Sequence, residues 1–170
     1  MANRELTGIL LVGGTSSRFG SPKAFARFEG ETLAERVWRL LGEACDERVA
    51  VGSLDGLPFP ALEDAGSGPV AAIAAGLRAS SHDFAVVAPV DMPRLTGDAL
   101  RLLAEVCRDA AVAQAGPLPC AVARTALPAF ETGERRLRTV LDSLDTAHVE
   151  LEERLLANVN TRADLDTLAR

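Results

Sequence analysis

The sequence has no tyrosine, one tryptophan, two histidines and three cysteines. Cys45, Cys107 and Cys120 are odd in number and far apart, so they fit neither a zinc site nor a disulfide framework. We expect three free thiols in a reducing cytoplasm. His82 and His148 stand alone in unrelated places, and nothing in the sequence resembles a nucleophile–base pair.

Long hydrophobic runs and an excess of positive charge are also missing. No apolar run approaches the 18 residues of a transmembrane helix, so no membrane partner is expected. The formal net charge is −6, which argues against a nucleic acid as the main partner. The 170 residues are 48% hydrophobic and 25% charged, which is typical of a globular protein, and the length fits one domain, 1–170.

The most informative stretch runs from Leu6 to Lys23. The apolar run within 6–12 is short enough for a buried strand, and it leads directly into a glycine-rich loop. Glycines here let the backbone lie against a ligand, and hydroxyls and cations follow. These loop residues are Gly13, Gly14, Thr15, Ser16, Ser17, Arg18 and Lys23. Such a loop suits phosphate binding, although Gly13-Gly14 as a simple turn is the alternative.

The loop differs from the two commonest phosphate-binding motifs. It is not a P-loop, because Lys23 lies three residues after Gly20, beyond Ser21 and Pro22. It is not the dinucleotide fingerprint, because no Gly-x-Gly-x-x-Gly follows the strand. The pattern Gly-Gly-x-Ser-x-Arg-Phe-Gly-x-x-Lys resembles nucleotidyltransferases that activate a phosphorylated acceptor with a nucleoside triphosphate.

Strands and helices alternate along the rest of the chain. Residues 24–31 are expected to be extended, with a turn at Glu29-Gly30. Further strands are expected at 48–51, 58–62, 84–88, 110–114, 118–123 and 149–151, and helices after Thr32, from Pro69, from Thr96, over 135–144 and from about Arg162. Ala99, Leu102, Leu103 and Val106 are expected to face inward. The alternation predicts an α/β fold with a mostly parallel sheet and helices on both faces.

Two aspartates follow predicted strands, so they would lie at the sheet edge where ligands bind in such folds. Asp91 follows the most hydrophobic strand and is suited to Mg²⁺, which also takes phosphate oxygens. Asp64 would share the metal or orient the acceptor. The alternatives are an Asx-turn at Asp91 and a purely loop-stabilising Asp64. Lys23 and Arg18 would neutralise charge as pyrophosphate leaves.

The expected reaction needs no general base. An acceptor phosphate, with a second pKa of about 6, is already an anion at neutral pH. It requires only positioning, a metal and cations for the developing charge. Arg135, Arg136 and Arg138 form a cationic patch that either contacts a phosphorylated or acidic partner or is a solvated face balanced by Glu131 and Glu134.

Four blocks of sequence resemble the molybdenum cofactor guanylyltransferases and their nucleotidyltransferase relatives. These blocks are 11–23, Glu63-Asp64 with 68–73, 89–93, and 158–161 with Asp164-Leu165. The resemblance implies a three-layer Rossmann-like nucleotidyltransferase fold. It also implies transfer of GMP from Mg-GTP to the phosphate of molybdopterin, with release of pyrophosphate. Transient contact with molybdenum cofactor synthesis proteins or acceptor enzymes is a further expectation.

The resemblance, for Gly13, Gly14, Lys23, Asp64, Asp91 and Asn160, and the residue patterns, for Arg18 and Arg136 among others, together suggest roles. Lys23, Arg18 and Asp91 are the expected catalytic residues, and Asp91 is the expected ligand of Mg²⁺. The nucleotide site would comprise Leu11, Gly13, Gly14, Thr15, Lys23, Asp64 and Asp91. Asn160 would lie near the pterin, and Arg136 is a second candidate for contact with the acceptor.

The Gly13-Gly14 pair resembles the guanylyl members of the family, whereas cytidylyl relatives tend to have alanine first. Other positions depart from the family pattern: Phe19 replaces methionine, Pro22 replaces aspartate, Gly52-Ser53 replaces a nucleotide-binding asparagine, and the loop from Asp64 to Gly68 is short. These departures bear on base and acceptor more than on reaction type. CTP or a sugar phosphate therefore stays an alternative.

A nucleotide-binding module without catalysis is the alternative from another class. Its dinucleotide-binding version requires an acidic residue about 20 residues past the glycines. Asp55 lies about twice that distance away, which counts against this version. A regulatory version would bind nucleotide without releasing pyrophosphate.

Overall fold

The computed structural model describes residues 4–13, 19–63 and 67–169. Seven strands form one sheet in the order β5-β4-β1-β6-β8-β7-β9. Their bounds are β1 Leu6–Leu11, β4 Glu47–Val51, β5 Ala61–Leu62, β6 Phe84–Pro89, β7 Ala110–Ala113, β8 Cys120–Ala123 and β9 Thr146–Val149. β8 runs antiparallel to β6 and β7, and the other neighbouring pairs are parallel. The predicted mostly parallel sheet is therefore confirmed.

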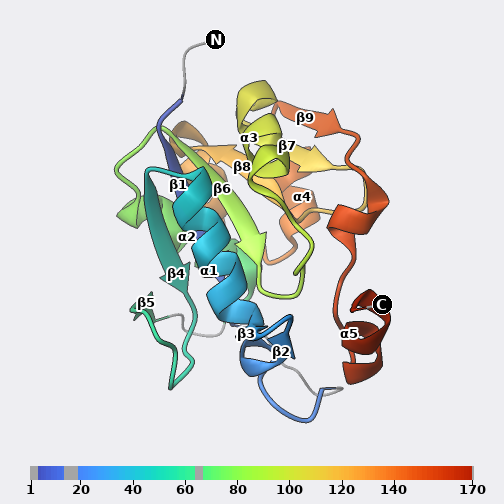
Figure 1. Cartoon of the computed structure of the whole chain (residues 1–170). Helices are drawn as coiled ribbons and strands as arrows, with labels where there is room; N and C mark the ends of the chain where they lie inside the picture. Colours follow the sequence, from blue (N-terminus) through green and yellow to red (C-terminus); the bar gives the residue numbers. More distant parts are fainter. Residues whose placement is uncertain (1–3, 14–18, 64–66, 170) are drawn as a thin grey trace.

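Helices cover both faces of this sheet, as predicted (Figure 1). The helices are α1 Leu33–Ala44, α2 Pro69–Ala79, α3 Gly97–Val106, α4 Leu137–Asp142 and α5 Arg162–Leu168. Alternate residues of β1 show the two cores: Leu10 packs with α1 and α3, and Ile9 packs with α2 and α4. The result is a three-layer α/β fold.

The expected helix starts have their physical signals in place. Thr32 caps α1 in a capping box with Glu35, Pro69 occupies the first turn of α2, and the Thr96 side chain accepts from the Ala99 N–H at the start of α3. The expected turn at Glu29-Gly30 joins a short hairpin, β2 (Arg27–Phe28) and β3 (Glu31–Thr32). These three helices therefore begin where their sequences specify.

Two predictions of detail were wrong. In α3, Ala99 and Leu103 are buried as expected, and Leu100 and Ala104 are buried beside them. Leu102 and Val106, which were also expected to face inward, are 39% and 38% exposed. Two apolar stripes compete in this helix, and packing against the sheet selects one of them. The last strand is β9, Thr146–Val149, and not 149–151, because its pairing with β7 sets the register of this half-polar edge strand.

Other elements are shorter than expected or were not predicted. The expected strand at 58–62 is only β5, two residues long, and the expected helix at 135–144 is the shorter α4. Three 3-10 helices were not predicted: η1 Lys23–Phe25, η2 Arg124–Glu131 and η3 Glu153–Leu156. None of the helices in the described part of the chain has both the length and the apolar character needed to span a bilayer.

A polar network lies at the amino ends of β1 and β4, on the edge opposite to the glycine loop. The buried Ser80 hydroxyl donates to Thr7 Oγ1 at 2.7 Å, and Thr7 donates to Glu47 Oε2 at 2.7 Å. The Ser81 N–H and hydroxyl also donate to Glu47. These hydrogen bonds, the Ser81 N–H foremost, lower the pKa of Glu47.

We expect Glu47→Gln to lower the free energy of unfolding by about 1–2 kcal/mol at neutral pH, because hydrogen bonds to a charged acceptor are lost. Since the folded-state pKa of Glu47 is lowered, its contribution is complete above the unfolded pKa of about 4.3 and is lost as the pH falls through the folded value. Denaturant unfolding from pH 7 to pH 3 measures this difference. The exposed Glu105→Gln is the control, and an equal pH dependence in both variants would contradict the expectation.

Candidate active site

A cavity of about 810 Å³ opens at the carboxyl edge of the sheet. Leu11 of β1 is in register with Pro89 of β6, so the segments that leave these two central strands emerge side by side. The cavity is lined by residues from 11–13, 22–24, 51–54, 68–72, 89–92 and 115–118, together with Asn158. Its walls therefore come from segments that are far apart in the sequence.

A lysine and an aspartate face each other in this cavity. Lys23 Nζ lies 3.3 Å from Asp91 Oδ2, and both side chains are partly accessible, at 19% and 24%. Lys23 begins the 3-10 helix η1, directly after Pro22, and Asp91 follows β6. The two charges thus come from the two expected ligand-binding loops, the first after β1 and the second after the central strand.

The segment before α5 completes this arrangement. Lys23 Nζ donates to Asn160 Oδ1 at 3.1 Å, and the N–H of the fully buried Val159 donates to the Asp91 carbonyl oxygen at 2.8 Å. Asp164 holds Asn160 in turn, because its Oδ2 accepts from the Asn160 N–H at 2.8 Å. The N–H groups of Asn160 and Thr161 lower the pKa of Asp164, and the charge of Lys23 adds to the effect.

The structure brings together most of the predicted site residues that it describes. Leu11, Gly13, Lys23 and Asp91 line the cavity, and Asn160 contacts Lys23. Arg136 precedes α4 and is not among the lining residues; its N–H donates to Glu134. The predictions for Gly14, Thr15, Arg18 and Asp64 concern positions outside the described residues.

The sequence analysis did not identify several of the lining residues. Pro117 and Leu118 form part of the wall beside β8, and Asn158 adds an amide from the segment before α5. The Gly116-Pro117 pair signals a turn, and Asn158 lies in one of the resembling blocks, so both carried a usable signal. The aliphatic character of Leu118 carried no such signal.

The segment after β4 packs directly against the glycine loop. Gly52 has φ +141°, and a Cβ at this position would lie 2.6 Å from Gly13 N and 2.8 Å from Val12 Cγ2. Only glycine fits such a close approach of two backbones. Gly52, which departs from the family pattern, is therefore required here by the position of Gly13.

A metal ion in this cavity would depend on its substrate. Within 4–13, 19–63 and 67–169, no three His, Cys, Asp or Glu side chains are grouped so that they could hold a metal ion. Asp91 offers one carboxylate beside open space, which suits Mg²⁺ because this ion is commonly held by one or two carboxylates together with water and phosphate oxygens. The described residues therefore fit a metal that arrives with a triphosphate.

Residues 8–149 match the family model described as a MobA-like NTP transferase domain. The chain belongs to this family. It is an enzyme of the nucleotidyltransferase type, and the resemblance seen in its sequence blocks is confirmed. A probable molybdenum cofactor guanylyltransferase from Mycobacterium marinum is 36% identical over 202 aligned positions, covering 100% of this chain and 98% of the relative.

Solved structures of other proteins share the fold. The molybdopterin-guanine dinucleotide biosynthesis protein A of Archaeoglobus fulgidus superposes with a TM-score of 0.80 at 23% identity, covering 96% of each chain. A Mycobacterium tuberculosis protein, solved as a complex with manganese, superposes with a TM-score of 0.73 at 18% identity, covering 97% and 98%. The predicted Rossmann-like nucleotidyltransferase fold is therefore confirmed.

We expect Gly52→Ala to weaken nucleotide binding about 10-fold, because the new methyl group pushes Gly13 out of place and backbone strain of this kind is worth about 1–3 kcal/mol. Equilibrium titration with GTP measures the effect. Gly56→Ala is the matched control: its φ is also positive, +87°, but its Cβ would meet only the Phe25 ring, at 3.5 Å. Equal GTP affinities of the two variants would contradict this expectation.

Proposed function

We propose that this enzyme transfers GMP from GTP to the phosphate of molybdopterin and releases pyrophosphate. The observation that carries the proposal is the pairing of Lys23 with Asp91 at the shared carboxyl edge of β1 and β6, inside a cavity of about 810 Å³. Family membership and the full-length relative named as a guanylyltransferase support the choice of nucleotide and acceptor.

In this proposal the triphosphate lies along the glycine loop. Backbone N–H groups of the loop donate to phosphate oxygens, and its glycines leave room for them. The assigned residues are Leu11, Gly13, Gly14, Thr15, Arg18, Lys23 and Asp64. Lys23 is placed to exchange its contact with Asp91 for a phosphate oxygen, because its ammonium group already reaches into the cavity.

Asp91 is the proposed ligand of Mg²⁺. Bound there, Mg²⁺ would supply positive charge that stabilises the charge developing on the triphosphate as pyrophosphate leaves. Asp91 keeps a defined position because its backbone carbonyl accepts from Val159 N–H, which leaves its side chain directed at the cavity. Asn160 then holds Lys23 beside the carboxylate when no phosphate is present.

The chemical step is a single displacement. An oxygen of the acceptor phosphate forms a bond to the α-phosphorus of GTP, the bond from that phosphorus to the bridging oxygen of the β-phosphate breaks, and pyrophosphate leaves with the electron pair. The attacking oxygen is an anion at neutral pH, so no side chain has to remove a proton. Lys23 and Arg18 would stabilise the departing charge, and Asn160 and Arg136 are the proposed contacts of the acceptor.

The proposal extends to the whole chain and its setting. We place the activity in one domain, 1–170, in the cytoplasm, where free thiols at Cys45, Cys107 and Cys120 are compatible with a reducing environment. The product would pass to molybdenum cofactor synthesis proteins or acceptor enzymes through transient contacts.

The test of this function is an assay with each nucleoside triphosphate, Mg²⁺ and molybdopterin. We expect pyrophosphate and the dinucleotide product to form fastest with GTP. Faster turnover with CTP, or with a sugar phosphate as acceptor, would replace the proposed substrates and keep the reaction. Absence of turnover with every triphosphate would overturn the proposal.

Asp91→Asn removes the carboxylate charge and keeps the shape of the side chain. We expect kcat to fall on the order of 100-fold or more, because charge stabilisation at the triphosphate is lost, while circular dichroism and thermal unfolding show an intact fold. Asp98→Asn, an exposed position on α3, is the control and should retain full activity. Unchanged pyrophosphate release by Asp91→Asn would show that this carboxylate has no part in the reaction.

A further inference from the structure

Three segments meet at the proposed site, and side-chain contacts in the cavity cannot hold them together during the reaction. Lys23 follows β1, Asp91 follows β6 and Asn160 precedes α5. A triphosphate between Lys23 and Asp91 replaces their direct contact, which is 3.3 Å in the free protein. The pairing of β1 with β6 fixes where the two segments leave the sheet, and a connection outside the cavity can hold their more distant parts at the correct separation once the substrate is bound.

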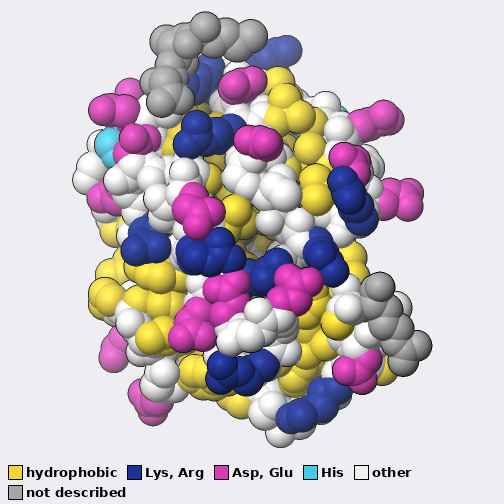
Figure 2. All heavy atoms as spheres, in the orientation of Figure 1, with side chains coloured by type: hydrophobic (Ala, Val, Ile, Leu, Met, Phe, Trp, Pro, Cys, Tyr) yellow, Lys and Arg dark blue, Asp and Glu magenta, His cyan; other side chains and the backbone are white. Residues whose placement is uncertain are grey.

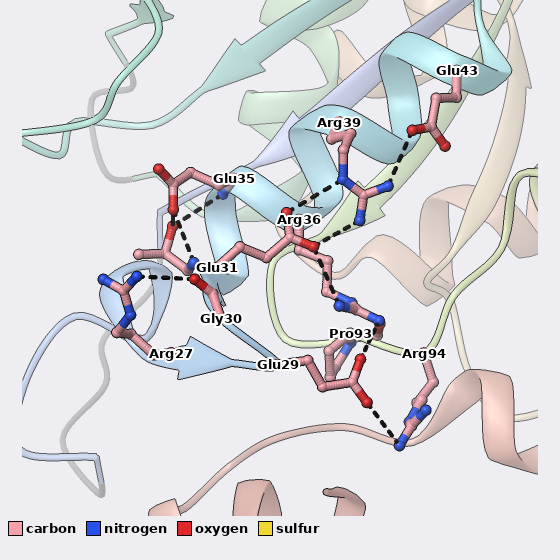
Figure 3. Close-up of polar contacts among 11 residues, drawn as sticks. Arg27, Glu29, Gly30, Glu31, Glu35, Arg36, Arg39, Glu43, Pro93 and Arg94 are labelled. Carbon is pink, nitrogen blue, oxygen red and sulfur yellow. Dashed lines mark hydrogen bonds and ion pairs between the residues drawn. The ribbon is translucent and has the colours of Figure 1, made fainter.

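A charged network lies directly beyond these segments (Figure 3). Figure 2 shows basic and acidic side chains interleaved near the middle of this face, over α1 and the loop after β6. At its centre, the Glu29 carboxylate lies 2.9 Å from Arg36 Nη2 and 3.4 Å from Arg94 Nη2. Glu29 thus joins two arginines from two different parts of the chain.

Glu29 holds this position in an unfavourable backbone conformation. Its φ is +49°, which is uncommon for a residue other than glycine, and the next residue, Gly30, also has a positive φ. A glycine would satisfy this turn more easily than a glutamate. In this conformation the Glu29 carboxylate forms ion pairs with both Arg36 and Arg94.

The two arginines connect the hairpin β2–β3 to the segment that carries Asp91. Arg36 Nε donates to the Pro93 carbonyl oxygen at 2.7 Å, two residues after Asp91. Arg94, three residues after Asp91, also donates to the Leu168 carbonyl oxygen of α5. The hairpin itself begins four residues after Lys23. The Glu29 carboxylate therefore joins the hairpin to the Asp91 segment, and Arg94 joins that segment to the terminal helix. Glu31 of the hairpin adds a second link, 3.3 Å from Arg36 Nη1.

An aromatic ring supports the same connection. The guanidinium carbons of Arg36 and Arg94 lie 5.0 Å and 5.2 Å from the centre of the Phe28 ring, which is only 3% exposed. Phe28 packs in a buried cluster with Phe19, Leu33 and Val159, so the network rests on this cluster. The arginines are therefore held from two directions, by charge and by the ring.

We propose that Glu29, Arg36 and Arg94 form a clasp that fixes the separation of Lys23 and Asp91, and that Glu29 is a positioning residue for nucleotidyl transfer. The inference rests on the proposed function. None of the three clasp residues lines the cavity, so they act through the backbone of the segments that they join. A misplacement of about 1 Å between reacting groups lowers rates by up to about 100-fold.

Glu29→Gln tests the clasp, because it removes the charge and keeps the size of the side chain. We expect kcat to fall about 10-fold while KM for GTP changes less than about 3-fold, since reacting groups are misplaced and ground-state contacts remain. Glu29→Asp restores the carboxylate at a turn that aspartate tolerates, and it should recover most of the lost kcat. Thermal unfolding reports any general loss of stability.

Glu43→Gln is the matched control. Glu43 belongs to the same charged network through Arg39 Nη1, 3.1 Å away, but its side chain is 61% exposed and has no contact with Arg36 or Arg94 among the described residues. We expect full activity from this variant. If the wild type is active and both Glu29→Gln and Glu43→Gln have its kcat, the clasp is overturned and the proposed function stands.

A second measurement is independent of the reaction. In the free protein, amide hydrogen exchange should become faster in both 19–28 and 91–95 in Glu29→Gln, and in neither segment in Glu43→Gln. Only the first variant removes the ion pairs with Arg36 and Arg94 and so weakens the connection, in which Arg36 keeps its ion pair with Glu31. If the wild type has no transferase activity but the exchange changes as expected, the proposed function is wrong, and the clasp stands as a connection between the two segments without a role in transfer. Unchanged exchange in either segment of Glu29→Gln would overturn the clasp.

Discussion

The parallel pairing of β1 with β6 is the constraint on which the rest of the structure depends. Because Leu11 and Pro89 share one register, the chain turns out of both strands at the same edge of the sheet. A slip of two residues in that pairing would shift the start of the segment that carries Lys23 by about 7 Å relative to the one that carries Asp91. The close packing of individual apolar side chains in the core on each face opposes such a slip and therefore also determines the geometry of the site.

The site is assembled in layers around this edge. Gly13 and Gly52 bring two loops into backbone contact, and Lys23 and Asp91 provide opposite charges 3.3 Å apart in the cavity. The Val159 N–H, which donates to the Asp91 carbonyl oxygen, attaches the segment before α5. Of these three contacts, the one between Lys23 and Asp91 joins two charged side chains, and the other two involve the backbone. The backbone supplies much of the architecture, so glycines and buried apolar residues matter here as much as the polar groups that would touch a substrate.

Local signals in the sequence predicted the elements that have strong signals of their own. The buried run before Gly13, the capping residues Thr32 and Thr96 and the position of Asp91 after the central strand all followed from local chemistry. The strand β9, the inward face of α3 and the reversed strand β8 depend on pairing and packing between distant segments. The contact of Asn160 with Lys23 was not specified in advance for the same reason, because it joins residues far apart in the sequence.

The contribution of the segment before α5 has a consequence for biosynthesis. A ribosome makes Lys23 and Asp91 well before Val159 and Asn160, so a nascent chain can form the central strands while its pocket lacks one side. During that interval the carbonyl of Asp91 faces water, and the lysine has not yet met its amide neighbour. The order of synthesis thus makes the central strands β1 and β6 available before the segment that completes the pocket.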